Sequence, residues 1–456
     1  MKRALTFQAR PRTALALLRG AVALACACAV AGAQAALPIE HWTQPSGAKI
    51  YMVATHALPI VDVQIDFDAG SRRDPPAQAG LAEVTADMLD KGIRASGEAP
   101  ALDENALGEA WADLGASFGA GAGSDRLSFS LRTLAKPQLL DQAVALAARE
   151  IGEPAFPADI WQREREQINA ALKEADTKPG TVAGRAYAKA VYGGHPYGEQ
   201  MVEETLARIS VDDMRQRYAQ TIAPCRAKLS IVGDVTRAQA DRIAAALLAR
   251  LPQQGDCSAL PPVAEVAPLA AAKVERIPFE SAQAHVLIGQ PGYPRRDPDH
   301  FALTLGNYVL GGGGFVSRLT DQVREKRGLA YSVYSGFSPG LHAGAFTIGF
   351  QTRPDQADAA LKVAREVLDK FVADGPTESE LQAAKDNLIG GFPLLLDSNR
   401  KLLGNVANIA WNDLPLDYLD TWTARVKAVT VADVKAAFKR KLQPERMVTV
   451  IVGAKP

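Results

Sequence analysis

The stretch from Gly70 to Gly92 reads GSRRDPPAQAGLAEVTADMLDKG. If it is helical, Glu83 and Asp87 lie one turn apart, so both carboxylates share one helix face. Paired carboxylates suit Ca²⁺ or Mg²⁺ better than Zn²⁺, but both ions take more oxygen ligands than this helix offers. We interpret the two residues as a solvated acidic pair with mild mutual repulsion, and keep a residual metal site as the alternative.

The same stretch resembles the active-site helix of the insulinase/pitrilysin family of inverted-motif zinc peptidases. The shared frame is G-S-R-x-D-P-P-x-x-x-G-L-A-x-x-T-x-x-M-L-x-K-G. In that family H-x-x-E-H supplies two zinc-binding His and a Glu that activates water. Here Glu83, Ala86 and Asp87 hold those three positions. The family's last ligand is a Glu seven residues after another Glu; the matching run starts at Glu164 and ends at Ala171. The resemblance implies a zinc metalloendopeptidase frame without ligands or base, so we expect no metal in this chain and no activity from it alone.

A second match lies downstream, in REKRGLAY from Arg324 to Tyr331. It resembles the family's arginine–tyrosine pair, which holds the substrate backbone opposite the zinc. Arg is always charged and can grip a peptide carbonyl, and a Tyr hydroxyl can donate to an oxyanion. The local pattern predicts a helix capped by Ser317 and ended by Gly328, followed by a strand over 329–334. The alternative is one surface Arg and one strand aromatic, but the spacing favours a substrate-binding pair.

Residues 1–35 have the pattern of a secretory signal peptide. A basic beginning and a short apolar run from Gly20 to Ala33 precede Ala33-Gln34-Ala35, an A-x-A cleavage site. That run is too short to span a membrane, and no later run approaches eighteen apolar residues. We therefore expect a periplasmic or secreted protein without a membrane span.

The charge of the processed chain argues against a nucleic-acid partner. The leader carries five of the 51 basic residues and no acidic one, which leaves 46 basic against 51 acidic residues, a net charge of −5. No basic block or aromatic–basic interleaving is present.

Two cysteines, Cys225 and Cys257, remain after processing. In an oxidising compartment an even count suggests a disulfide, which would close a loop of about thirty residues and add roughly 2–4 kcal/mol. The alternative is a pair of buried thiols.

The chain repeats itself with an offset of 220 residues. Ser210-Val211-Asp212-Asp213 matches Thr430-Val431-Ala432-Asp433, each a capped helix start, and Ile231-Val232-Gly233 matches Ile451-Val452-Gly453. Two copies at this period indicate two homologous domains. The predicted division is a signal peptide over 1–35, a first repeat over 36–252 with the degenerate zinc motif, a linker over 253–272, and a second repeat over 273–456 with the arginine–tyrosine pair.

Each repeat mixes strands and helices without strict alternation, which predicts an α+β fold with antiparallel sheets. The strand pattern is clearest at 61–67 and 127–131 and the helix pattern at 137–151 and 361–371. The resemblance implies that the two halves, each an antiparallel sheet packed with helices, enclose a cavity.

Together these features predict a non-catalytic, substrate-binding subunit of a periplasmic insulinase-like zinc endopeptidase. A homologous chain carrying H-x-x-E-H would supply zinc and base as its heterodimer partner, and this chain would supply Arg324 and Tyr331 for a peptide substrate. One alternative is a stand-alone peptide-binding or chaperone-like pseudopeptidase. Another is a purely structural subunit, for which the arginine–tyrosine pair would not be needed.

Overall fold

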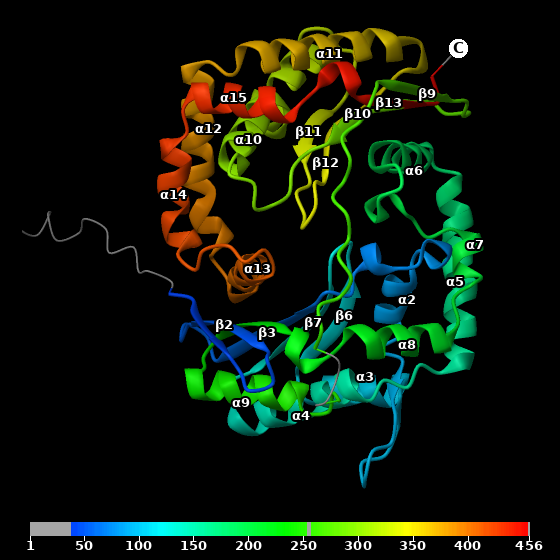
Figure 1. Cartoon of the computed structure of the whole chain (residues 1–456), viewed down its shortest axis with the longest axis vertical. Coiled ribbons are helices and arrows are strands. Elements are labelled where there is room, and N and C mark those ends of the chain that lie inside the picture. Colours follow the sequence, from blue (N-terminus) through cyan, green and yellow to red (C-terminus); the bar gives the residue numbers. More distant parts are fainter. Residues whose placement is uncertain (1–37, 253–256, 455–456) are drawn as a thin grey trace, which may run out of the picture. The chain divides into compact units, whose positions relative to one another are not determined.

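A computed structural model describes residues 38–252 and 257–454. The predicted signal peptide and residues 253–256 of the predicted linker lie outside these ranges. The described residues from Ile39 onward belong to one compact unit (Figure 1). For description, we call residues 39–252 the N-terminal half and residues 273–454 the C-terminal half.

The N-terminal half is built on a sheet with strand order β1–β2–β8–β3–β7–β6. Its strands are β1 Glu40–Thr43, β2 Lys49–Ala54, β3 Ile60–Phe67, β6 Ser117–Ala122, β7 Leu127–Leu134 and β8 Lys228–Gly233. A short pair, β4 Gly92–Ile93 and β5 Leu102–Asp103, lies outside it. The helices are α2 Leu81–Asp87, α3 Glu104–Asp113, α4 Pro137–Gly152, α5 Ala158–Asp176, α6 Pro179–Tyr192, α7 Glu203–Leu206, α8 Val211–Thr221 and α9 Arg237–Leu248.

The sheet of the C-terminal half has the strand order β11–β12–β10–β13–β9. Read in this direction, its strands correspond to β6, β7, β3, β8 and β2 of the first sheet. Its strands are β9 Lys273–Ile277, β10 Ala284–Pro291, β11 Val333–Phe337, β12 Ala345–Thr352 and β13 Val448–Val452. The helices are α10 His300–Asn307, α11 Ala357–Asp374, α12 Glu378–Gly391, α13 Asn399–Trp411, α14 Tyr418–Ala428 and α15 Val431–Lys441. The duplicated motifs occupy the same elements: the capping boxes of Ser210 and Thr430 begin α8 and α15.

The α+β fold is confirmed, but the prediction of antiparallel sheets is wrong in one respect. Each sheet contains one parallel pair, β2 with β8 and β9 with β13. The two strands of each pair are far apart in sequence, so the helices between them provide the long crossover that a parallel pair requires. The other neighbours in both sheets pair antiparallel.

The sheet of the N-terminal half has one apolar and one polar face. Alternate residues of β3, from Val61 to Phe67, enter the main hydrophobic core together with α4 and α9, as the alternation predicted. The residues between them, Asp62, Gln64 and Asp66, face the opposite side, in register with Val232, Ser230 and Lys228 of β8. This second face therefore places polar groups beside the buried Val232, and each polar group needs a hydrogen-bond partner when a helix covers it.

The halves exchange equivalent helices. Helix α13 packs on β8, β3 and β2 of the N-terminal half, and α6 packs on β10 and β13 of the C-terminal half. The two helices occupy corresponding positions, about 220 residues apart. The α6 contact is apolar: Ala183, Tyr187 and Val191 join a cluster with Val448, Val450 and Val452. The Tyr187 hydroxyl also donates to the Phe346 carbonyl at 2.8 Å.

The α13 contact combines apolar and polar groups. Helix α13 buries apolar side chains such as Leu403, Val406 and Ala407. Lys228 donates to the carbonyls of Ala410 and Trp411 at 2.8 and 3.2 Å and pairs with Asp413 at 2.7 Å. Several buried polar atoms at this interface have no partner among the described residues, including Asp62 Oδ2, Ser230 Oγ and Trp411 Nε1. Such atoms in a native core are typically satisfied by buried water.

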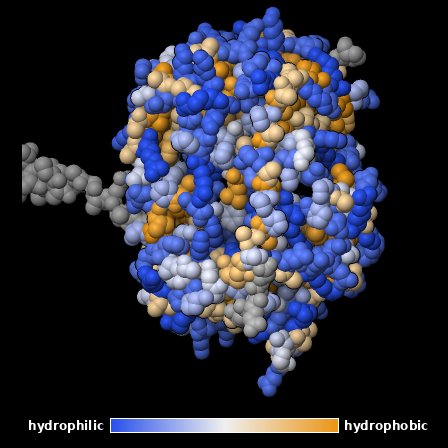
Figure 2. Space-filling model, in the orientation of Figure 1, coloured by the Kyte–Doolittle hydropathy of each residue, from blue (hydrophilic) through white to orange (hydrophobic). Residues whose placement is uncertain are grey.

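Cys225 and Cys257 are joined by a disulfide, with their Cα atoms 5.9 Å apart. The bridge spans 32 positions of the sequence and ties the segment before β8 to the segment that leads toward the C-terminal half. Figure 2 shows mainly hydrophilic side chains on the face viewed, with small apolar patches among them. Within the described ranges, no helix is both long and apolar enough to cross a membrane.

Candidate functional site

The degenerate metal motif lies on α2, as the sequence predicted. Ala86 points into the core with 3% of its surface exposed, whereas Glu83 and Asp87 are exposed. Desolvation, followed by the neighbouring Asp87 carboxylate, raises the pKa of Glu83. Desolvation, followed by Asp90, raises the pKa of Asp87, to which Glu164 of α5 also contributes. The carboxylates therefore repel one another as they stand.

No group of three or more His, Cys, Asp or Glu side chains in the described residues is arranged to hold a metal ion. Ala171 lies exposed on α5, seven positions after Glu164, and offers no ligand atom. The Glu164 carboxylate accepts from Arg163 at 2.7 Å. Zinc sites use imidazole, thiolate and carboxylate ligands, and the two alanines supply none of these. The donor set on α2 and α5 therefore does not fit a zinc ion.

Residues around the degenerate motif hold α2 in place. Asp74 accepts hydrogen bonds from the amides of Gly80 and Ala82 at 3.2 and 3.1 Å, so it caps the start of α2. Buried Arg72 bridges Asp68 at 2.5 Å and Asp125 at 3.0 Å. These contacts hold the helix whether or not a metal is bound on it.

Asp125 continues the brace into the C-terminal half. It accepts from the Tyr197 hydroxyl at 2.6 Å and from the Leu341 amide at 3.0 Å. Tyr197 lies in the segment His195-Pro196-Tyr197-Gly198, and Leu341 lies in the turn between β11 and β12. The retained frame is thus explained by folding of the chain, independently of catalysis.

Arg324 and Tyr331 lie next to each other, with the guanidinium carbon 5.1 Å from the centre of the Tyr331 ring. Arg324 belongs to a π-helical segment, η7 Thr320–Glu325, and Tyr331 lies in the loop before β11. The prediction of a strand from residue 329 is wrong, because β11 begins at Val333. Gly328 has a φ of +60°, and the Leu329 amide turns back to the Val323 carbonyl at 2.9 Å, so these residues close the helix instead.

A third residue completes this group. The ring of Phe315 also lies beside Arg324, with its centre 4.7 Å from the guanidinium carbon. Phe315 and Tyr331 are 71% and 80% exposed, and the adjacent Val316 is 74% exposed. The only ion pair of Arg324 among the described residues joins Nε to Glu325 at 3.3 Å, and its terminal nitrogens have no recorded partner there. We call Phe315, Val316, Arg324 and Tyr331 the aromatic–arginine cluster.

Reasoning from the sequence did not single out Phe315. The signal that could have found it is the pair of large apolar residues directly after the glycine run 311–314, which is unusual for a solvent-exposed turn. The cluster and α2 lie in different halves. None of the recorded ion pairs or ring contacts of Arg324 or Tyr331 in the described part of the chain reaches α2 or α5. The two predicted sites therefore make no direct contact in the described part of the chain.

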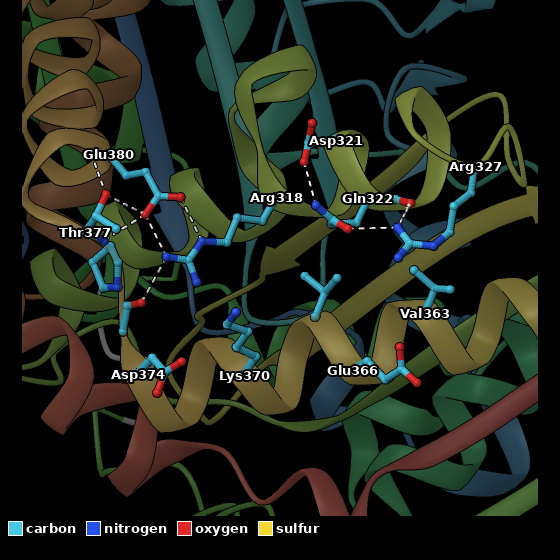
Figure 3. A pocket seen from close by; sticks show the side chains of 13 residues that line it. Arg318, Asp321, Gln322, Arg327, Val363, Glu366, Lys370, Asp374, Thr377 and Glu380 are labelled. Carbon is cyan, nitrogen blue, oxygen red and sulfur yellow. Dashed lines mark hydrogen bonds and ion pairs between the residues drawn. The ribbon is translucent and has the colours of Figure 1, made fainter.

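A groove of about 560 Å³ lies between the 318–327 segment and α11 (Figure 3). Two of its arginines have partners: Arg318 donates to Glu380 at 2.8 and 2.6 Å, and Arg327 donates to the Gln322 amide oxygen at 2.8 Å. The Arg318 hydrogen bonds lower the pKa of Glu380 to about 2. The Arg318–Glu380 hydrogen bonds join this segment to α12. Arg324 does not line the groove.

Strand β6 is the last strand of its sheet and lies beside α2. It pairs with β7 along one side over its whole length. Its sequence, SFGAGA, contains no charge and no proline, the residues that usually protect an edge from pairing with another chain. Gly119 and Gly121 have open space where a side chain would stand. The edge next to the degenerate motif is therefore able to accept an additional strand.

Comparison with known proteins identifies the family. The family model described as insulinase, peptidase family M16, matches residues 49–205, and the one described as peptidase M16 inactive domain matches residues 208–388. The crystal structure of a peptidase M16 inactive domain from Pseudomonas fluorescens is 35% identical and superposes with a TM-score of 0.86, covering 92% of this chain and 98% of that one. The chain belongs to peptidase family M16.

Curated M16 relatives include proteins with and without an assigned protease name. An uncharacterized zinc protease of Streptomyces coelicolor is 27% identical, over 91% of this chain and 89% of that protein. A relative from Helicobacter pylori named non-peptidase homolog is 24% identical, over 88% of this chain and 90% of that protein. The resemblance drawn from the sequence is confirmed at the level of the family.

Proposed function

We propose that this M16 chain is a non-catalytic, substrate-binding subunit of a periplasmic zinc endopeptidase. A homologous partner with an intact H-x-x-E-H motif would provide the zinc and the base. This chain would provide Arg324 and Tyr331 to hold the peptide backbone. The pattern of the first 35 residues and the disulfide support an oxidising compartment such as the periplasm.

The observation that carries the proposal is that Arg324, partly exposed, and Tyr331, 80% exposed, lie side by side in a chain whose α2 and α5 offer no zinc ligand set. A guanidinium with free N–H groups beside a phenol hydroxyl can bind a carbonyl oxygen as it becomes an oxyanion. Such a pair works only opposite a nucleophile, and this chain has none on α2. A second chain can supply it, because Tyr331 is exposed and Arg324 is partly exposed.

The test is reconstitution with an H-x-x-E-H partner and a quenched fluorescent peptide. Tyr331→Phe removes one hydroxyl from an exposed side chain, so folding and assembly are expected to persist while turnover falls roughly 10²–10³-fold. Tyr334→Phe is the matched control, since Tyr334 is also half-exposed, three residues away on β11. Arg324→Ala is expected to weaken peptide binding as well, and Arg327→Ala is its control.

Full activity of Tyr331→Phe and Arg324→Ala in an intact complex would refute the role of the pair. A purely structural subunit would then be the better description of this chain.

The uncapped edge of β6 favours a second candidate, a stand-alone peptide-binding protein. An extended peptide that adds to β6 would gain main-chain hydrogen bonds without any catalytic group. Hydrogen exchange of the isolated chain tests this: added peptide is expected to protect residues 117–122, while β1, at the opposite edge, serves as the internal control. Unchanged exchange of β6 at saturating peptide would argue against this candidate.

A further inference from the structure

The aromatic–arginine cluster has more apolar surface than a backbone anchor requires. Gripping a peptide carbonyl needs a guanidinium and a hydroxyl, which Arg324 and Tyr331 supply. Phe315 and Val316 add two large apolar side chains, each more than 70% exposed. Exposed apolar groups of this kind, gathered around a polar anchor, are typical of a ligand-binding surface.

The turn that carries these residues is fixed at both ends. Gly311 lies against β11 so closely that an added Cβ would come within 2.5 Å of the Ser335 amide nitrogen. At the other end, Gly314 has a φ of +60°, and the Ser317 hydroxyl donates to its carbonyl at 2.7 Å. Phe315 is therefore presented by a short 3₁₀ turn, Gly314–Val316, whose conformation is set before any ligand arrives.

The position of the rings indicates what they recognise. The centres of the Phe315 and Tyr331 rings lie 4.7 and 5.1 Å from the Arg324 guanidinium carbon, and its terminal nitrogens have no partner among the described residues, so they remain for an acceptor such as a peptide carbonyl. A side chain next to that carbonyl would lie against Phe315 and Val316. The nearby Glu325 and Lys326 are charged and exposed, so the apolar contact is limited to the area of Phe315 and Val316.

We propose that Phe315 and Val316 form a specificity surface that selects peptides with a large apolar side chain, aromatic above all, beside the carbonyl bound by Arg324. This inference rests on the proposed function and gives it a substrate class. A protein–protein contact fits less well, since stable interfaces bury roughly 800 Å² per partner and this surface ends at charged residues.

The test uses the full processed chain and unlabelled ten-residue peptides in isothermal titration. The peptides share a Gly/Ser/Ala background and differ at one central position, Phe, Leu, Ala or Asp. Burying an aromatic ring is expected to favour the Phe peptide over the Ala and Asp peptides by roughly tenfold or more, with the Leu peptide between them.

Phe315→Ala is expected to remove most of this preference, and Phe315→Trp to keep it. Leu416→Ala, which truncates an exposed apolar residue outside the cluster, is the matched control and is expected to change nothing. Thermal melting of each variant checks that the fold is retained.

Equal affinity of the wild-type chain for all four peptides would overturn the inference and leave the proposed peptide-binding role standing. A Phe preference that survives Phe315→Ala would overturn it too, because selection would then come from another surface. If no peptide binds even at millimolar concentration, the inference and the peptide-binding role fail together.

Discussion

Glu150 allows a sharp test of the buried electrostatics in the N-terminal half. The residue lies on α4 with 1% of its surface exposed and accepts a hydrogen bond from Trp111 Nε1 at 3.0 Å. Burial raises the pKa of Glu150 from 4.5 to about 7. The folded chain therefore binds one proton more than the unfolded chain between these two values. The free energy of unfolding then falls as pH rises from about 4.5 to about 7.

The size of the change in unfolding free energy follows from the shift in the pKa of Glu150. At about 1.4 kcal/mol per pH unit, Glu150 costs the folded state about 3 kcal/mol above pH 7. Glu150→Gln keeps the shape and an acceptor for Trp111 but carries no charge. We expect this variant to match wild type near pH 5 and to be more stable by up to about 3 kcal/mol at pH 8.

Urea unfolding at both pH values, followed by circular dichroism, measures the difference. Glu153→Gln is the matched control, three residues further along. Burial alone would raise the pKa of Glu153, but hydrogen bonds from Ser96, Arg250 and Arg149 lower it overall. Its ionised form therefore stabilises the fold, and its loss is expected to destabilise the chain at pH 8. If Glu150→Gln gives no stabilisation at pH 8, the assignment of a buried, proton-binding carboxyl is wrong.

Three further outcomes are expected. The purified chain is expected to hold no stoichiometric zinc after mild dialysis, and one tightly bound Zn²⁺ per chain in elemental analysis would contradict the ligand set described for α2 and α5. Alkylation in denaturant is expected to label Cys225 and Cys257 only after reduction, and replacing both by Ser is expected to lower stability by roughly 3–4 kcal/mol for a 32-residue separation, measured by urea unfolding. Tyr187→Phe, which removes the buried hydroxyl bonded to the Phe346 carbonyl, is expected to cost about 1–2 kcal/mol, and an unchanged unfolding midpoint would show that this bond between the halves contributes nothing.

Local patterns in the sequence predicted the local structure well. The apolar alternation around Val63 and Phe129 corresponds to β3 and β7, and the 137–151 pattern to α4. These predictions succeeded because each element packs one face against a core, so its apolar residues recur with the period of a strand or of a helix. The α2 motif was placed correctly through its resemblance to the family's active-site helix. The residues shared with that helix build the cap and the brace of α2.

Features that depend on distant partners were not predictable in this way. The 220-residue offset indicated two homologous halves but could not tell that α6 and α13 each cover the sheet of the other half. The parallel strand pairs join segments separated by almost a whole half of the chain. Phe315 became meaningful only when the π-helical segment placed Arg324 against its ring. In each case the deciding contact depends on how the chain folds in space, which no period in the local sequence encodes.

The exchange of α6 and α13 has a consequence for synthesis on the ribosome. The face of the first sheet that α13 covers is complete once β8 ends at Gly233, but α13 ends at Trp411, about 180 residues later. At roughly 5–20 residues per second, that face remains without its helix for about 10–35 seconds. During this time Val232, which is fully buried in the folded chain, lies on an uncovered sheet face, and transiently exposed apolar surface favours aggregation. Helix α6 is synthesised before the sheet that it covers, so the second sheet meets no such delay.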